Sequence, residues 1–170
     1  MEFTLRTYRE SDARAIQYYA NNRDIAKYLR DVFPYPYALE HAEAYIASVL
    51  AEEGNGTSFV QAIDVGGEAV GSIGIFLKDD VYRRSAELGY WLGEPFWGKG
   101  IMTSAVRQIC REGFLRFDIV RIFAEPYAQN AGSRRVLENA GFALEGVLKK
   151  SVYKFGTFFD SCVYALVKED

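Results

Sequence analysis

Residues 86–117 read AELGYWLGEPFWGKGIMTSAVRQICREGFLRF, and the pattern in this stretch decides the fold. Apolar and polar side chains alternate from 86 to 92, which predicts a β-strand. Gly98 and Gly100 then bracket a short loop, and apolar residues recur at helical spacing from about Thr103 to Phe117. The stretch is therefore expected to form a strand, a glycine loop and a helix, in that order.

The segments on both sides extend this unit into an α/β fold. Residues 119–125 predict a second strand, and a strand-helix-strand unit favours parallel neighbours joined by a right-handed crossover. Gly66-Gly67 predicts a tight turn between antiparallel strands at 59–65 and 69–77. The other expected elements are a strand near 3–7, helices near 13–20 (with Ser11-Asp12 as its cap), 38–53 and 131–140, and a closing hairpin of 142–153 and 158–168. A mixed sheet with helices on both faces is the predicted fold class.

Composition limits the classes of protein to which the chain can belong. With 170 residues and 49% hydrophobic content, residues 1–170 are expected to form a single domain with one core. A net charge of −3 argues against a broad basic surface for nucleic acid. No uncharged stretch approaches the roughly 20 residues needed to cross a bilayer, so we expect a soluble cytoplasmic protein that does not enter a membrane.

The cysteines and the aromatic residues need separate interpretations. Cys110, Cys162 and the single histidine, His41, have no metal-ligand spacing, so no metal is expected and the cysteines are interpreted as core residues. Aromatic residues make up 15% of the chain. Most are expected in the core, but those of residues 33–37, which read FPYPY, are also candidates for lining a substrate cleft.

The loop from Trp97 to Met102 is a candidate anion site. The first N–H groups of a helix have no partners within the helix, and the positive end of the helix dipole lies there. Gly98 and Gly100 would let the backbone approach an anion closely. A short glycine loop is also commonly a plain turn, and both interpretations stay open at this point.

Two nucleotide-binding motifs do not fit this loop. Residues 93–99 begin like a P-loop, but Gly100 stands where a serine or threonine should hold magnesium. A dinucleotide fingerprint needs a glycine three residues after Gly100, where Thr103 stands. We therefore expect neither a nucleoside triphosphate nor a nicotinamide cofactor.

A second motif, Asn130-Ala131-Gly132-Ser133, follows the second parallel strand and opens the next helix. Asn130 or Ser133 could simply cap that helix. Alternatively, the Asn130 side chain could bind the amides of an extended ligand such as pantetheine, with the Ser133 hydroxyl near the ligand's terminal thiol.

Together these motifs resemble the GNAT superfamily of N-acetyltransferases, and within it the RimJ/RimL-like branch that acetylates ribosomal-protein N-termini. The resemblance runs from Leu5 to about Leu166. It depends on residues 86–92, on Phe96-Trp97-Gly98-Lys99-Gly100, on Asn130-x-x-Ser133-x-x-Val136-Leu137-Glu138-x-x-Gly141-Phe142, and on the tail Tyr153-x-x-Gly156-x-x-x-Asp160-x-x-x-Tyr164.

The resemblance implies an acetyl-CoA-dependent N-acetyltransferase with a mixed, mostly antiparallel sheet of about seven strands, splayed around one parallel pair and flanked by about four helices. It implies that backbone groups of one strand bind pantetheine: Leu88, Gly89, Tyr90, Trp91 and Leu92. It assigns the pyrophosphate to the N–H groups of Trp97, Gly98, Lys99, Gly100, Ile101, Met102 and Thr103. Asn130 and Ser133 complete the coenzyme contacts, and an N–H near Tyr90 or Trp91 would stabilise the oxyanion.

At the positions where relatives have catalytic residues, the chain departs from the family pattern. Leu137 stands where other branches often have a tyrosine acid, and Val152 stands near a glutamate base of some relatives. Ser133 is therefore the candidate acid, and Glu87 is the candidate base that deprotonates the amine, directly or through water. Asp160 is expected to be structural. Without a triad, direct transfer in a ternary complex is expected.

Several alternatives stay open for the partners. The acceptor would be an amine on a protein N-terminus or a small molecule, and a homodimer is left open.

Pro95 replaces the glutamine or arginine of many relatives, which should not affect a site made of backbone N–H groups. A non-catalytic acyl-CoA-binding or regulatory module on the same fold is the alternative function.

Overall fold

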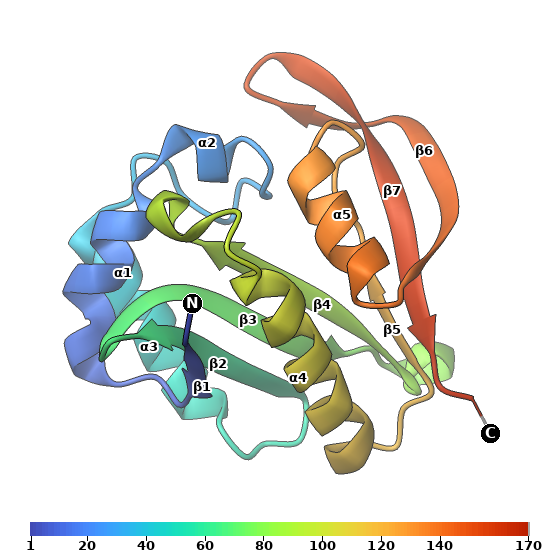
Figure 1. Cartoon of the computed structure of the whole chain (residues 1–170), viewed down its shortest axis with the longest axis horizontal. Helices are drawn as coiled ribbons and strands as arrows, with labels where there is room; N and C mark the ends of the chain where they lie inside the picture. The colour runs from blue at the N-terminus through green and yellow to red at the C-terminus, as the bar shows by residue number, and fades with distance from the viewer. Residues whose placement is uncertain (170) are drawn as a thin grey trace. The chain divides into compact units, whose positions relative to one another are not determined.

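The computed structural model describes residues 1–169 (Figure 1). Their helices are α1 Ala13–Ala20, α2 Arg23–Ala26, α3 Leu39–Glu52, α4 Ile101–Arg116 and α5 Ala131–Asn139. Their strands are β1 Thr4–Arg6, β2 Ser58–Val65, β3 Glu68–Leu77, β4 Ser85–Leu92, β5 Arg121–Ala124, β6 Ala143–Lys154 and β7 Thr157–Val167. Three short 3-10 helices are η1 Glu10–Asp12, η2 Asp80–Tyr82 and η3 Glu94–Phe96.

The strands form a seven-stranded sheet in the order β1-β2-β3-β4-β5-β7-β6. β4 and β5 pair in parallel, whereas β1 with β2, β5 with β7 and β6 with β7 pair antiparallel. This confirms the predicted mixed sheet with one parallel pair. Gly66 and Gly67 both have positive φ (64° and 93°), as expected for the tight turn between β2 and β3.

The helices differ from the prediction in one respect. The described residues contain five α-helices where about four were expected, because the four-residue α2 was missed. One helical turn is too short to show an apolar periodicity. Its cap is local, since the Asn22 side chain accepts a hydrogen bond from the Asp24 N–H at 2.8 Å.

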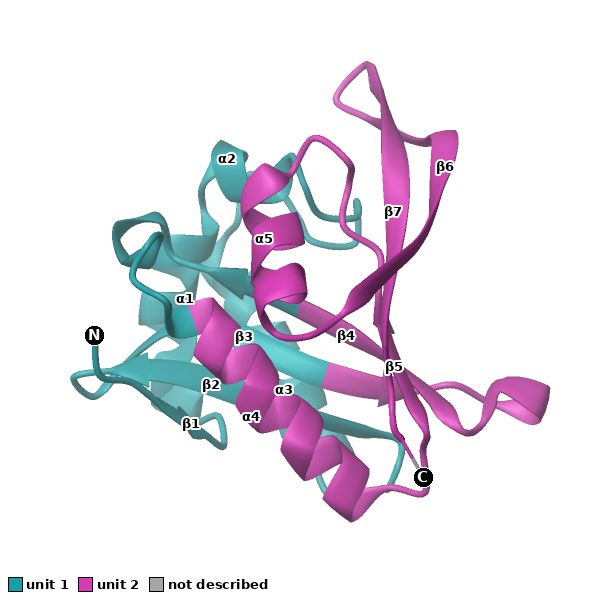
Figure 2. Ribbon diagram, turned by 45° about the vertical axis from the view of Figure 1, so that its right-hand side comes forward, with its two compact units in different colours: residues 1–74, 90–101 teal, residues 75–89, 102–170 magenta. Residues whose placement is uncertain are grey.

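The chain divides into two compact units, coloured separately in Figure 2. Residues 1–74 and 90–101 form unit 1, and residues 75–89 and 102–170 form unit 2. The expectation of a single domain over residues 1–170 stays a prediction.

The core of unit 1 lies between α1, α3 and the first strands. Small residues on both helices let them pack closely, and the fully buried Ile16 and Ile46 fill the space between them. The buried members of this cluster are Tyr8, Ala13, Ile16, Ala20, Tyr37, Ala42, Ile46, Ala62 and Ala69.

The core of unit 2 includes the inner face of α4. The spacing of Ala105, Val106 and Ile109 predicted this face, and all three are fully buried. Gly113 continues it, because a Cβ there would lie 2.4 Å from Ile75 Cδ1. A larger residue at position 113 would require the Ile75 side chain to move.

An ion cluster joins β1, η1 and β2 in unit 1. Arg6 donates to both carboxylate oxygens of Asp12, at 2.8 and 2.9 Å, and to Asp64 Oδ2 at 2.5 Å. Asp12 stands at the N-cap of α1, as predicted, but its carboxylate accepts from the Arg9 N–H instead of capping the helix. Burial alone would raise the pKa of Asp12, but the hydrogen bonds from Arg6 and Arg9 outweigh it and lower the pKa below 3.8.

We predict that Asp12→Asn lowers the free energy of unfolding at neutral pH by about 2 kcal/mol, a value between those of surface and fully buried ion pairs. Because the folded-state pKa is depressed, this contribution is complete above the unfolded pKa and is lost as pH falls through the folded pKa. Urea unfolding of both proteins, from neutral pH down through the folded-state pKa of Asp12, should therefore show a difference in the free energy of unfolding that becomes smaller as the pH falls.

Asp24→Asn is the control, because Asp24 pairs with Lys27 on the exposed surface and its loss should cost little. Equal stability of Asp12→Asn and the unsubstituted protein at neutral pH would contradict the prediction.

Candidate functional site

The predicted site residues are divided between the two units. Unit 1 holds Tyr90, Trp91, Leu92 and the loop residues Trp97, Gly98, Lys99, Gly100 and Ile101. Unit 2 holds Glu87, Leu88, Gly89, Met102, Thr103, Asn130 and Ser133.

The glycine loop of unit 1 is anchored to the end of β4. The Trp97 indole Nε1 donates to the Leu92 carbonyl oxygen at 2.7 Å, and the Gly93 N–H donates to the Val70 carbonyl at 2.8 Å. Gly93 has no room for a side chain, because a Cβ would lie 2.9 Å from Tyr19 Cδ1. The loop therefore leaves the strand in a fixed direction.

The two loop glycines have the backbone conformation that the anion-site hypothesis requires. Gly98 and Gly100 have φ of 72° and 78°, in the left-handed region that favours glycine. Apart from each glycine and the residues next to it in the chain, no atom of the described residues lies within 4 Å of the position of a Cβ at either glycine. Within the same residues, the N–H groups of 98–100 donate no hydrogen bond. A loop with open space and unpaired donors directly before α4 can accept an anion.

The end of β4 in unit 1 is packed by aromatic rings. Trp91 lies edge to face with Phe33, with ring centroids 6.0 Å apart, and Phe33 contacts Tyr37 at 5.1 Å. Tyr37 is buried, so these two residues of the 33–37 segment serve the core, while Tyr35 is 41% exposed. Of the three aromatic residues in this segment, Tyr35 is the exposed one.

In unit 2, the parallel ladder between β4 and β5 ends early. The last pair is Glu87 with Phe123, although β4 continues to Leu92 and β5 continues to Ala124. The ladder with β5 therefore leaves Leu88 and Gly89 without a partner on that side. Glu87 is half-buried, and its carboxylate has no hydrogen bond or ion pair among residues 1–169.

Of the two roles that the sequence left open for Asn130, the structure shows the cap and leaves the ligand contact a prediction. Asn130 caps α5, because its Oδ1 accepts from the Ser133 N–H at 3.2 Å. Its Nδ2 makes no hydrogen bond within the described part of the chain and can still donate to a ligand. Capping therefore uses Oδ1 and leaves Nδ2 available for a ligand.

The remaining candidate residues already have hydrogen-bond partners or cannot act in proton transfer or nucleophilic attack. Asp160 accepts from the Lys150 N–H at 2.8 Å and from Lys149 Nζ at 3.3 Å, and these bonds lower its pKa. Lys150 has φ of 53° at a bulge in β6, so Asp160 stabilises an unusual backbone, as the structural interpretation expects.

Leu137 is fully buried, and burial raises the pKa of Cys110 to about 12. A thiolate nucleophile at Cys110 is therefore disfavoured.

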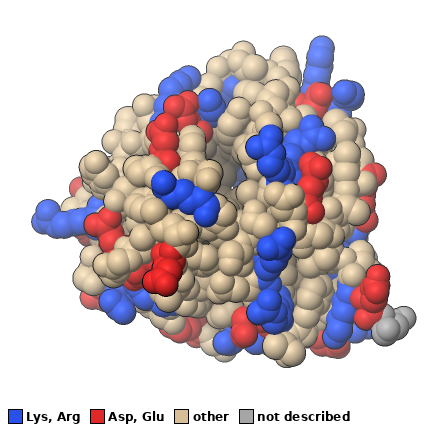
Figure 3. All heavy atoms as spheres, viewed as in Figure 1, with Lys and Arg blue, Asp and Glu red and all other residues tan. Residues whose placement is uncertain are grey.

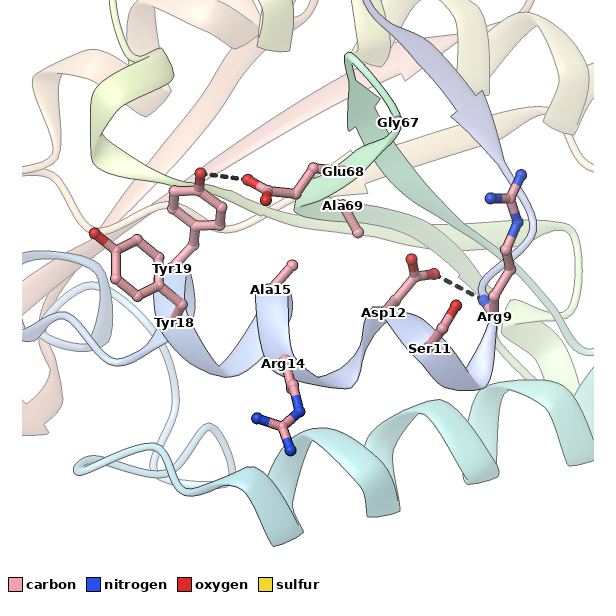
Figure 4. Close-up of a pocket in the computed structure, with 10 residues that line it drawn as sticks. All are labelled: Arg9, Ser11, Asp12, Arg14, Ala15, Tyr18, Tyr19, Gly67, Glu68 and Ala69. Carbon is pink, nitrogen blue, oxygen red and sulfur yellow. Dashed lines mark hydrogen bonds between the residues drawn. The ribbon is translucent and has the colours of Figure 1, made fainter.

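A separate polar hollow of about 570 Å³ lies on unit 1 (Figure 4). None of the predicted site residues lines it. Its acidic groups are already engaged, since Glu68 accepts from the Tyr19 hydroxyl and Asp12 accepts from the Arg9 N–H. The side chains of Arg9 and Arg14 point in opposite directions in Figure 4. This hollow therefore offers no converging set of groups for a ligand.

Sequence reasoning missed several contacts of the site. The Trp97 to Leu92 bond and the hydrogen bonds of Arg134 to Tyr164 and to Ala128 join residues whose pairing has no local sequence signal.

The described residues contain no cluster of potential metal ligands, and none of their helices has the length and apolarity to span a membrane. Figure 3 shows acidic and basic side chains intermixed on the visible face.

Comparison with known proteins places these features in a family. The profile of a family described as acetyltransferase (GNAT) domain matches residues 2–143. The Bacillus subtilis (strain 168) protein named uncharacterized N-acetyltransferase YoaA is 30% identical over 167 residues, which cover 96% of this chain and 92% of that protein.

Two further similarities extend this result. The putative ribosomal N-acetyltransferase YdaF of Bacillus subtilis (strain 168) is 35% identical over 104 residues, covering 61% of this chain and 56% of that protein. A solved structure of RimL, a ribosomal L7/L12 alpha-N-protein acetyltransferase in complex with coenzyme A, superposes with a TM-score of 0.87 and 25% identity. The superposition covers 98% of this chain and 94% of RimL. The chain therefore belongs to the GNAT family of acetyltransferases.

Proposed function

We propose that the chain transfers the acetyl group of acetyl-CoA to a primary amine by direct attack in a ternary complex. The observation that carries this proposal is the glycine loop, whose unpaired N–H groups and open space directly before α4 suit a pyrophosphate. The likeness to a RimL structure that contains coenzyme A supports it. A cytoplasmic location is part of the proposal.

The proposed coenzyme contacts are mainly with the backbone. The pyrophosphate would accept hydrogen bonds from N–H groups of Gly98, Lys99, Gly100, Ile101, Met102 and Thr103. The sequence also assigned the Trp97 N–H to the pyrophosphate, but in the structure it donates to the Glu94 carbonyl at 3.1 Å. Pantetheine would lie along Leu88, Gly89, Tyr90, Trp91 and Leu92, where the ladder to β5 has ended. Asn130 would donate from its free Nδ2 to a pantetheine carbonyl, and Ser133 would lie near the sulfur.

Glu87 is proposed as the general base. An alkyl amine is mostly protonated at pH 7 and must lose a proton before it attacks the thioester carbonyl. Glu87 stands at the last pair of the β4-β5 ladder and has a carboxylate without a partner among the described residues. A backbone N–H near Tyr90 or Trp91 would stabilise the oxyanion, and Ser133 would protonate or stabilise the departing thiolate.

The acceptor is proposed to be a protein N-terminus, with a small-molecule amine as the second candidate. RimL and YdaF, both named for ribosomal targets, favour the protein N-terminus. A non-catalytic acyl-CoA-binding module is the alternative from another class, and the inert Leu137 and Val152 favour it. Release of coenzyme A on addition of an acceptor distinguishes an enzyme from such a module.

We predict that Gly98→Val abolishes the rise in melting temperature that saturating acetyl-CoA causes by mass action. The new Cβ would occupy the space where the pyrophosphate is proposed to lie. Gly54→Val is a matched control, because Gly54 also has positive φ (79°) and open space around it. Both variants should lose stability through backbone strain, but only Gly98→Val should lose the response to acetyl-CoA. An undiminished response in Gly98→Val would exclude the loop as the phosphate site.

We predict that Glu87→Gln lowers kcat by roughly a hundredfold at neutral pH while acetyl-CoA affinity is kept, because the amide cannot accept the proton. The pH profile of the unsubstituted enzyme should show an acidic limb that the variant lacks. Glu112→Gln is the control for loss of one carboxylate, since Glu112 forms only an exposed pair with Arg116 on α4. Unchanged turnover in Glu87→Gln would show that Glu87 is not the general base and has a structural role.

A homodimer is proposed through the free edge of β6. This strand ends the sheet, and it exposes Leu144, Val147 and Leu148, of which Leu148 is 49% exposed. Light scattering after gel filtration should report a dimer, and Leu148→Glu should give a monomer that still binds acetyl-CoA. A monomeric unsubstituted protein would contradict this proposal.

A further inference from the structure

The hydroxyl of Tyr164 in β7 makes two hydrogen bonds to α5 within unit 2. It accepts from Arg134 Nε at 3.1 Å and donates to Glu138 Oε1 at 3.0 Å. Tyr164 is 1% exposed, and burial raises the pKa of its hydroxyl, which therefore stays protonated at neutral pH. The hydroxyl is a fixed connection between the strand and the helix.

Arg134 extends this connection to the loop before α5. Its Nη1 donates to the Ala128 carbonyl at 3.3 Å, and the Ala128 N–H donates to the Asp160 carbonyl of β7 at 2.8 Å. The Cys162 N–H also donates to the Pro126 carbonyl at 2.8 Å. One guanidinium thus joins the strand, the loop at 126–130 and the first turn of the helix.

The orientation of Asn130 depends on this loop. Its N–H donates to the Tyr127 carbonyl at 2.9 Å, its carbonyl accepts from the Arg134 N–H at 3.1 Å, and its Oδ1 accepts from the Ser133 N–H. These three bonds leave Nδ2 as the side-chain group that can contact a ligand. The direction of Nδ2 is consequently set by the positions of the loop and of Arg134.

We propose that Tyr164 and Arg134 are positioning residues for the coenzyme: they fix the loop and the first turn of α5 so that Asn130 presents Nδ2 to pantetheine. This inference rests on the proposed coenzyme site. Burial alone does not require a hydroxyl at position 164, because phenylalanine would fill the same volume. The two bonds of the hydroxyl are what phenylalanine would lack.

The test is the dissociation constant of coenzyme A, measured by calorimetry, which needs no acceptor. Tyr164→Phe should raise the dissociation constant roughly threefold to tenfold, the range expected for one lost hydrogen bond. Arg134→Ala changes a side chain that is not buried in the core, and it should raise the dissociation constant similarly. This second variant tests the proposal if Tyr164→Phe folds poorly. If both act through Asn130, neither change should add to the loss in an Asn130→Ala background.

The control is Tyr8→Phe. Tyr8 is buried in unit 1, and its hydroxyl has no hydrogen-bond partner among the described residues. This variant should keep the dissociation constant of the unsubstituted protein. It matches Tyr164→Phe in the chemical change but removes no hydrogen bond.

Two results would overturn the positioning role. A lower melting temperature of Tyr164→Phe with unchanged coenzyme A affinity would show that the hydroxyl is purely structural. The effect of this variant could also add fully to that of Asn130→Ala, which would show that it acts elsewhere. Absence of coenzyme A binding by the unsubstituted protein would be a different failure, because it would remove the proposed coenzyme site itself.

Discussion

The parallel pairing of β4 with β5 is the constraint on which the proposed site depends. Antiparallel strands can be joined by a two-residue turn, but a parallel pair needs a crossover of a dozen or more residues. Here the crossover contains the short η3, the glycine loop and α4, so the loop lies between the end of β4 and the start of α4. The same pairing then stops at Glu87 and Phe123, before either strand ends. One constraint therefore places both the loop proposed to bind the pyrophosphate and the unpaired end of the parallel ladder.

The coenzyme contacts proposed here use backbone groups that any sequence carries. The chain contributes instead the residues that let those groups be reached: Gly98 and Gly100 with positive φ, and Gly93 with no room for a side chain. Asn130 shows how a cap and a ligand contact can coexist, because its Oδ1 supports the helix while Nδ2 stays available. A capping side chain contributes about 1 kcal/mol to stability in any case, so the two roles do not compete.

The fold was predictable from sequence where the signal is local. The spacing of Ala105, Val106 and Ile109 predicted the buried face of α4, and Gly141 ends α5 with φ of 98°. The short α2 gave no periodicity and was missed. The Arg6 cluster and the bonds of Tyr164 join residues between 6 and 58 positions apart, and no spacing rule pairs such residues. The candidate catalytic residues were predicted from chemistry and resemblance, and their roles stay proposals.

The most direct test of the account is to incubate the protein with acetyl-CoA that carries an isotopically labelled acetyl group, together with peptides and small amines. Mass spectrometry would then show which product carries the label. We expect at least one primary amine to gain one labelled acetyl group, with equal release of free coenzyme A. Tight binding of acetyl-CoA without label on any amine would contradict it and favour a non-catalytic acyl-CoA-binding module.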